Sequence, residues 1–348
     1  MNNYTNFWDW FQTKEEAFYK IIKNKQGIEG FFNELSSKLK EVNQGFNFLV
    51  GMSPDGSVEL VVSPDGVIKN IVFVEELINS APIFSNWKFT ALKPQQDIKN
   101  IGIRMEGYTY NSKNLFFYPN NHKNYPDEVD INIVYDDYQE KDASTITNGV
   151  WILLDNYLGE LNAITTIDNL KVISKEEAEE ELIPISKLKA FLIWREKEFV
   201  EKYNGTRYNT KDDGYSCFEG EFENGNGLIA IINTTLLQWD SKASHPWVFR
   251  LNIGYDGGDT GMPDSETLEL LNQLEDELMV QLSDADGYLN IGRQTGNSLR
   301  EIYFTCKEFR KPSKVMYQFL EKYTSQFTFS HNIYKDKYWQ SFERFRQV

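Results

Sequence analysis

The feature that most restricts the possible folds is the order of helix-like and strand-like segments in the C-terminal half of the chain. Residues 264–282 form an amphipathic pattern in which leucines recur on one side, and Asp264 or Ser265 can cap its first turn. Three strand-like segments precede this helix, while a hairpin, a helix with Pro312 at its start and a last strand follow it. The order β-β-β-α-β-β-α-β predicts one antiparallel sheet covered by two helices.

The N-terminal half contains the tetrapeptide Ser-Pro-Asp-Gly twice, at 53–56 and at 63–66. Proline presets the backbone for a turn and glycine accepts a positive φ, so each copy predicts a turn. The residues between the copies, 57–62, have the β-branched content of a strand. A calcium loop does not fit, because Asp55 and Asp65 stand at opposite ends of that strand. The two copies therefore predict two turns of a meander.

The other N-terminal segments come in clusters. Two amphipathic helices precede the meander, and a helix and a strand follow it. We then expect a hairpin formed by "GIRMEGYTY" and "KNLFFYPN", an alternating strand at "EVDINIVYDD", and a helix over "TNGVWILLDNYLGELNAI" with Trp151 facing inward. The acid run 176–181 reads as a solvated turn of helix. Because the elements cluster instead of alternating strictly, an α+β fold with a mainly antiparallel sheet is favoured over a parallel βαβ fold.

A chain of 348 residues exceeds one ordinary core, so two domains are predicted. We place an N-terminal α+β domain at 1–182, a helix and linker at 183–214, and a C-terminal α+β domain at 215–348. The predicted fold class is α+β with two domains, each a mainly antiparallel sheet covered by helices. The second domain is expected to be ferredoxin-like in layout.

The net charge of −16 argues against binding to nucleic acid or to an anionic membrane, since both require local positive potential. Residues 251–300 carry ten acids and two bases, whereas residues 301–348 carry nine bases and five acids. Two interpretations are open: neighbouring solvated faces of opposite sign, or an acidic surface that docks a basic partner. No apolar run is long enough to span a membrane and no signal peptide is evident, so we expect a cytoplasmic protein.

Recognisable catalytic and metal-binding motifs are missing from the sequence. The three histidines lie far apart, and neither CxxC nor HExxH occurs. A pairing of Cys217 with Cys306 stays open, and Cys306, in a strand, is expected to be buried and inert. The Gly-rich segment 254–261 lacks a basic residue, so it reads as a flexible connection and less readily as a binding loop. The acids Asp127, Glu128 and Asp130 could supply paired carboxylates for hydrolysis, although acids at an exposed sheet edge are the commoner case.

The second domain resembles the domain-of-unknown-function family 695, which occurs mostly in bacteria. The likeness rests on "GMPDSETLELLNQLEDEL" at 261–278, "GRQTGNSLREIYF" at 292–304 and "DKYW" at 336–339. Met262 stands where the family has Leu. The family's hairpin is matched by Gly292, Thr295, Gly296, Arg300 and Glu301. The N-terminal half resembles a region that accompanies this family, marked by "FWDWF", "SPDG" before a helix, "APIFSNW" and "LLDNYLGE".

The resemblance implies no activity and no catalytic residues, because none is established for the family. Related chains sometimes bear a domain similar to the ribonuclease E inhibitor regulators, which are small acidic proteins that act by binding an enzyme. We therefore expect a binding or regulatory protein and not an enzyme, such as an acidic inhibitor or immunity-type protein with a basic protein as its partner. Two alternatives stay open: an enzyme of unrecognised type that uses paired carboxylates, and a small-ligand module lined by aromatic residues.

The candidate binding surface is the helix at 264–282 together with the loop before it. Its residues are Asp256, Asp259, Asp264, Glu266, Glu269, Trp247, Arg300, Glu301 and Trp339. No catalytic residue, cofactor or metal is predicted.

Overall fold

The computed structural model describes residues 3–346. The chain divides into two units, with the boundary between Lys197 and Glu198. The division falls inside α6 (Leu188–Tyr203), within the segment 183–214 that the sequence assigned to a helix and linker. The α+β fold class is confirmed, because helices combine with sheets whose strand pairs are mostly antiparallel.

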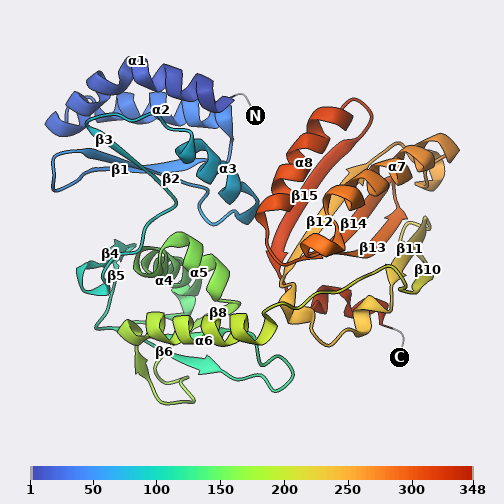
Figure 1. Ribbon diagram of the computed structural model, residues 1–348. Coiled ribbons are helices and arrows are strands. Elements are labelled where there is room, and N and C mark those ends of the chain that lie inside the picture. Colours follow the sequence, from blue (N-terminus) through green and yellow to red (C-terminus); the bar gives the residue numbers. More distant parts are fainter. Residues whose placement is uncertain (1–2, 347–348) are drawn as a thin grey trace. The chain divides into compact units, whose positions relative to one another are not determined.

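The C-terminal unit contains one six-stranded sheet and two long helices (Figure 1). Its strands are β10 (Tyr215–Glu221), β11 (Gly227–Asn233), β12 (Trp247–Gly254), β13 (Tyr288–Gly296), β14 (Leu299–Cys306) and β15 (Thr328–Lys335), and its helices are α7 (Ser265–Gln281) and α8 (Arg310–Tyr323). All neighbouring strands are antiparallel, in the order β10-β11-β13-β14-β12-β15. The elements from β12 to β15 follow the sequence β-α-β-β-α-β and have the strand order of a ferredoxin-like sheet. The predicted layout is confirmed, with the β10–β11 hairpin added beside β13.

The two faces of this sheet are covered by different segments. α7 lies against one face, where the Arg300 side chain of β14 reaches Asn272 of the helix. The other face carries an apolar cluster with the C-terminal 3-10 turn Gln340–Phe345. The members of that cluster include Val248, Leu289, Ile291, Tyr303, Trp339, Phe342 and Phe345. Both faces are therefore buried over the central strands, which explains the long apolar runs in their sequences.

The N-terminal unit differs from the single sheet that we expected, because its strands form three separate sheets (Figure 1). The first part comprises α1 (Asn3–Asn24), α2 (Ile28–Val42), β1 (Asn47–Met52), β2 (Val58–Ser63), α3 (Ile68–Asn79) and β3 (Trp87–Ala91). The second part comprises β4 (Gly102–Met105), β5 (Tyr108–Asn111), β6 (Leu115–Asn120), β7 (Asp130–Tyr135), α4 (Ala143–Leu158), α5 (Glu160–Thr166), β8 (Asn169–Ile173) and β9 (Ile183–Pro184).

Both parts of this unit use the same local order, an antiparallel strand pair, a helical crossover and a third strand parallel to the second. β3 is parallel to β2 across α3, and β8 is parallel to β7 across α4 and α5. The prediction of mainly antiparallel pairing is confirmed, and these two pairs are the parallel exceptions in the described residues. A helix between two strands returns the chain to the end of the sheet where the first of them began, so the next strand runs in the same direction.

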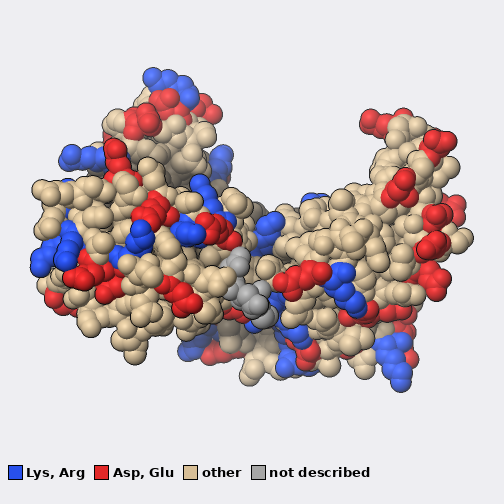
Figure 2. Space-filling view, turned by 90° about the horizontal axis from the view of Figure 1, so that it is seen from above, with Lys and Arg blue, Asp and Glu red and all other residues tan. Residues whose placement is uncertain are grey.

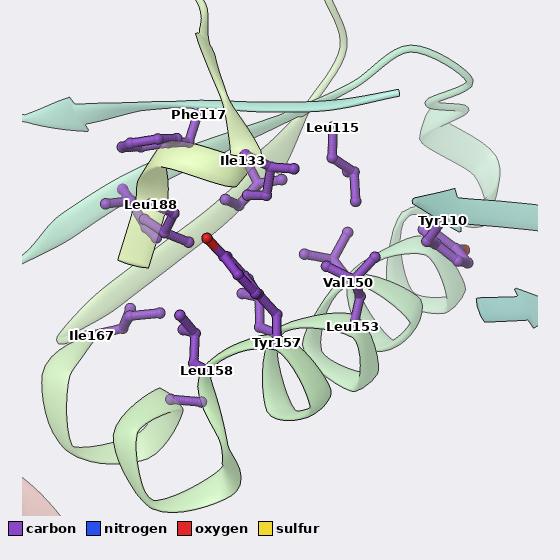
Figure 3. Close-up of a cluster of buried hydrophobic side chains, with 14 of the residues drawn as sticks. Tyr110, Leu115, Phe117, Ile133, Val150, Leu153, Tyr157, Leu158, Ile167 and Leu188 are labelled. Carbon is purple, nitrogen blue, oxygen red and sulfur yellow. The ribbon is translucent and has the colours of Figure 1, made fainter. Parts of the chain in front are cut away.

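Helix α4 packs its apolar side on the four-stranded sheet, whose strand order is β8-β7-β6-β9 (Figure 3). Val150, Leu153 and Tyr157 point from the helix toward Leu115 and Ile133 of the strands. Trp151, which we expected to face inward, is half-buried at the margin of this cluster. The helix comes so close to Tyr110 that a Cβ at Gly149 would lie 2.3 Å from its ring. A glycine is therefore required at that point of the helix.

Two further local predictions are wrong. "GIRMEGYTY" is itself the β4–β5 hairpin, and "KNLFFYPN" supplies β6, which pairs with β7 instead. Gly107 takes a positive φ of 85°, which allows the tight turn inside the first segment. The acid run 176–181 forms turns and bends, not a turn of helix. Like charges at neighbouring positions repel one another and disfavour a helix there.

Candidate functional site

The exposed part of the predicted surface lies at the start of α7 and in the loop before it. Five side chains define this acidic segment, namely Asp256, Asp259, Asp264, Glu266 and Glu269, and each is exposed. None of the five forms an ion pair within residues 3–346, and residues 254–270 contain no Lys or Arg. Asp264 accepts a hydrogen bond from the Thr267 amide at 2.8 Å, which caps the helix and lowers the pKa of that carboxyl.

Two of the later acids of the region are paired with bases, so they add little to an acidic surface. Glu277 lies 2.7 Å from Lys322, and Asp286 lies 2.9 Å from Lys311. Both bases belong to residues 301–348, which carry nine bases and five acids. Asp276, farther along α7, is exposed and forms no ion pair within the described residues. The unpaired negative charge is therefore densest over residues 256–269, the part of the region best placed to attract a cationic partner.

Three members of the candidate surface are in the interior instead. Trp247 is 5% exposed, Trp339 is 2% exposed and Arg300 is 2% exposed. Trp247 contacts Phe309 at the start of α8, and the Trp339 indole donates a hydrogen bond to the His245 carbonyl at 3.0 Å. These residues stabilise the fold, and the sequence alone could not separate buried tryptophans from exposed ones.

Arg300 belongs to a buried polar network that joins α7 to the β13–β14 hairpin. Its guanidinium donates to Asn272 at 2.9 Å and to Thr295 at 3.1 Å, and it lies 3.8 Å from Glu275. Glu275 also accepts a hydrogen bond from Arg293 at 3.0 Å. Burial raises the pKa of Glu275 and lowers the pKa of Arg300 to about 10. The network satisfies charges that would otherwise be costly in the interior.

Glu301 lies on the opposite face of the sheet, where it also has partners. It accepts hydrogen bonds from Gln294 and from the Tyr303 hydroxyl, and its carboxylate lies 3.7 Å from Arg250. The side chain is 13% exposed. Glu301 therefore does not extend the acidic segment.

The Gly-rich loop before α7 is held by hydrogen bonds to the β13–β14 turn. The Ser298 amide donates to the Gly261 carbonyl at 2.7 Å, and the Tyr255 hydroxyl donates to the same oxygen at 3.0 Å. Gly261 has a φ of 69°, and a Cβ there would lie 2.8 Å from the Asn297 backbone. These contacts fix the start of α7, so the loop presents its acids on a defined backbone.

The two cysteines and the acid Asp130 are among the residues that the sequence offers for catalysis. Cys217 is an exposed free thiol, and Cys306 is a buried one whose pKa burial raises well above its usual value. The Asp130 carboxylate contacts the His122 ring at 2.5 Å and accepts a hydrogen bond from Asn120. Within residues 3–346, no group of three or more His, Cys, Asp or Glu is arranged to hold a metal ion.

The structure also contains a cavity in the N-terminal unit that the sequence did not predict. It has a volume of about 440 Å³ and lies between α2, β1 and the second Ser-Pro-Asp-Gly turn. The lining residues are Phe32, Asn33, Ser36, Phe46, Asn47, Phe48, Leu49, Ser63, Asp65 and Lys93. We call this the N-terminal cavity.

A buried carboxylate, Glu160, fixes the wall of the N-terminal cavity. Glu160 is 0% exposed, and one of its oxygens accepts hydrogen bonds from the Ser63 hydroxyl at 2.8 Å and the Gly66 amide at 3.0 Å. Its other oxygen accepts from the Lys93 amide at 3.1 Å. Glu160 therefore connects the second Ser-Pro-Asp-Gly turn to the chain after β3.

Lys93 supplies the cation of a charged cluster that also contains Asp65, Asp155 and Glu160. Its ammonium lies 2.8 Å from Asp65 and 3.7 Å from Asp155. Burial alone would lower the pKa of Lys93, but the hydrogen bond and charge of Asp65 and the charges of Glu160 and Asp155 raise it. Burial raises the pKa of Asp155 to about 6 despite the nearby ammonium. The ammonium group therefore has Asp65 and Asp155 as ion-pair partners, and the charge of Glu160 also acts on it.

The segments that form this charged cluster can be recognised in the sequence, but the sequence does not show that they lie next to each other. "SPDG" at 63–66 and "LLDNYLGE" at 153–160 are separate markers in the sequence. The hydrogen bond from Ser63 to Glu160 spans 97 positions of the chain. A single sequence does not show that such distant residues meet.

Taken with the fold, these sites define an α+β protein with a ferredoxin-like C-terminal unit and a separate cavity in its N-terminal unit. Residues 223–345 match the model of a family of unknown function (DUF695). The match confirms the family resemblance of the C-terminal half. No curated protein matches the chain. None of the helices in residues 3–346 combines the length and apolar character that crossing a bilayer requires.

The residues that carried the family resemblance have structural roles here. A Cβ at Gly292 would lie 2.1 Å from the Ile231 carbonyl oxygen, and one at Gly296 would lie 2.5 Å from that of Gly227. Thr295 accepts the hydrogen bond of Arg300. The motif therefore holds the hairpin against β11 and α7.

Proposed function

We propose that this protein acts in the cytoplasm by binding a basic protein partner through the acidic segment, and that it is not an enzyme. The observation that carries the proposal is the group of five exposed carboxylates in residues 256–269 that form no ion pair within the described chain. A masking role, such as that of an inhibitor or immunity-type protein, fits a surface that attracts cationic groups.

The charge of the C-terminal unit and the loop before α7 support this proposal. Residues 254–270 contain no Lys or Arg, and Figure 2 shows acidic side chains along the upper right edge of the C-terminal unit with no basic side chain among them. The hydrogen bonds of the loop to Ser298 hold the backbone before binding, so less conformational entropy is lost in a complex. Concentrated negative potential also accelerates association with a positively charged protein.

The experiment compares partner capture by three forms of the full chain in native lysate. The first is the wild type, and the second replaces the five carboxylates of the acidic segment with the matching amides. Asn at position 264 remains a good helix cap, so the fold is retained. The third replaces the five glutamates of 176–181 with glutamine, which gives the same change in net charge at a different place.

The proposal predicts a partner that the wild type and the 176–181 variant capture equally and that the acidic-segment variant loses. Loss of the partner in both variants would show that capture depends on the overall negative charge of the chain and not on the acidic segment. Equal capture by all three forms would remove the acidic segment as the binding surface.

A further inference from the structure

The N-terminal cavity has a charge and shape of its own that binding at the acidic segment does not use. We propose that this cavity binds a small organic cation that carries a guanidinium group. The inference is independent of the proposed function, because it concerns a different unit of the chain.

Negative charge exceeds positive charge at the cavity and directly behind it. Asp65 and Lys93 line the cavity, 2.8 Å apart. Asp155 and Glu160 do not line it, but their carboxyl groups lie behind this pair, where both raise the pKa of Lys93. Lys93 occupies one oxygen of Asp65, and the side chain of Asp65 remains 50% exposed. The excess of negative charge favours a cationic ligand, and the accessible oxygen of Asp65 can accept its hydrogen bonds.

Part of the cavity wall is aromatic. Phe32 and Phe48 line the cavity with their rings stacked, with centroids 5.4 Å apart and planes 27° apart. Phe32 remains 39% exposed, so its ring is open to solvent. A guanidinium group is planar, stacks on aromatic faces and forms paired hydrogen bonds with carboxylates. It therefore uses both the phenylalanine wall and Asp65 more fully than a spherical ammonium ion.

The backbone that places Asp65 and Lys93 at the cavity is fixed before any ligand binds. Asp65 and Leu92 have positive φ values of 45° and 64°, which residues other than glycine adopt at a cost. Both lie next to groups that Glu160 binds, because Gly66 follows Asp65 and Lys93 follows Leu92. The buried carboxylate thus holds two unfavourable backbone positions that orient Asp65 and Lys93 at the cavity.

The size of the cavity sets the class of ligand. A volume of about 440 Å³ lies within the range of small-molecule sites. The amide and hydroxyl groups of Asn33, Ser36 and Asn47 can bind polar atoms in the rest of the ligand. The same chemistry could come from a free metabolite or from an arginine side chain in a peptide.

The test uses the full chain and calorimetric titration with defined probes. Agmatine represents a free guanidinium compound, and an acetylated, amidated Gly-Arg-Gly peptide represents an arginine side chain. Adipate, which carries carboxylates at both ends of a similar chain, is the anionic probe. We expect agmatine, the arginine peptide or both to bind, with the tighter of the two identifying the source, and adipate not to bind.

Three variants distinguish the proposed contacts from general damage. Asp65→Asn should weaken agmatine binding at least tenfold, whereas Asp55→Asn, the same position in the first Ser-Pro-Asp-Gly copy, should leave it unchanged. Phe32→Ala should weaken it about two- to fivefold. Lys93→Met removes the competing ammonium and should tighten binding at least threefold, an effect that misfolding does not produce.

The lysine variant has its own control in Lys88→Met, which removes an exposed lysine of the same unit, ion-paired with Glu59. That variant should bind agmatine as the wild type does. The proposal is overturned if neither guanidinium probe binds wild type or Lys93→Met, if adipate binds in preference, or if Asp55→Asn weakens binding as much as Asp65→Asn.

Discussion

Replacing Glu160 with glutamine should destabilise the N-terminal unit strongly, although the side chain keeps its shape. The carboxylate accepts three hydrogen bonds, from the Ser63 hydroxyl and from the amides of Gly66 and Lys93. A glutamine offers one acceptor oxygen and one NH₂ donor in place of the two oxygens. In the better orientation its NH₂ group faces the Lys93 amide, so one charge-assisted bond is lost and two donors oppose each other.

The size of the effect follows from those bonds. Hydrogen bonds to charged groups contribute about 1.5–3 kcal/mol, and a buried donor without a partner costs about 1–3 kcal/mol. We therefore expect Glu160→Gln to lower the free energy of unfolding by about 2–4 kcal/mol. For a unit of this size, the midpoint of thermal unfolding should fall by about 4–15 °C.

The assay combines urea denaturation with hydrogen exchange at single amides. Exchange should accelerate most at Gly66 and Lys93, whose amides donate to the carboxylate. Glu180→Gln, an exposed glutamate of the same unit, should change stability by no more than about 0.5 kcal/mol. Equal stability of the two variants, or unchanged exchange at both amides, would refute the role assigned to Glu160.

Three further predictions concern other buried groups. Burial lowers the pKa of His245 to about 3, so protonation favours the unfolded state. The stability of the C-terminal unit should therefore fall by about 2–3 kcal/mol from pH 6.5 to 4.5. His245→Phe should flatten that part of the pH profile of unfolding. Glu275→Ala leaves the buried Arg300 without its carboxylate and should cost about 3–5 kcal/mol in a denaturation curve. Gly149→Ala places a methyl group against the Tyr110 ring and should cost about 1–3 kcal/mol by thermal unfolding, despite the better helix propensity of alanine.

The C-terminal fold could be predicted because its signals are local. The cap at Asp264, the leucine stripe of α7 and the turn between β13 and β14 each act within a few residues, and each is present as expected. Their order then leaves few ways to arrange one antiparallel sheet. The N-terminal unit was harder, because whether β3 pairs with β2 in parallel depends on where α3 returns the chain.

The candidate sites were predictable only in part. The exposed acids of residues 256–269 follow from charge and capping patterns, whereas the burial of Arg300 depends on Asn272 of a distant helix and on Glu275. Charged residues usually lie on the surface, so an interior arginine contradicts the ordinary expectation. The N-terminal cavity depends on contacts between segments that are far apart in the chain.

The most direct test of the central claim is the salt dependence of partner binding. With the captured partner purified, its dissociation constant is measured between 50 and 500 mM salt for the wild type, the acidic-segment variant and the 176–181 variant. The account predicts that the acidic-segment variant binds at least tenfold more weakly at low salt and has a flatter salt dependence, while the 176–181 variant follows the wild type. Identical affinity and salt dependence in all three forms would contradict it.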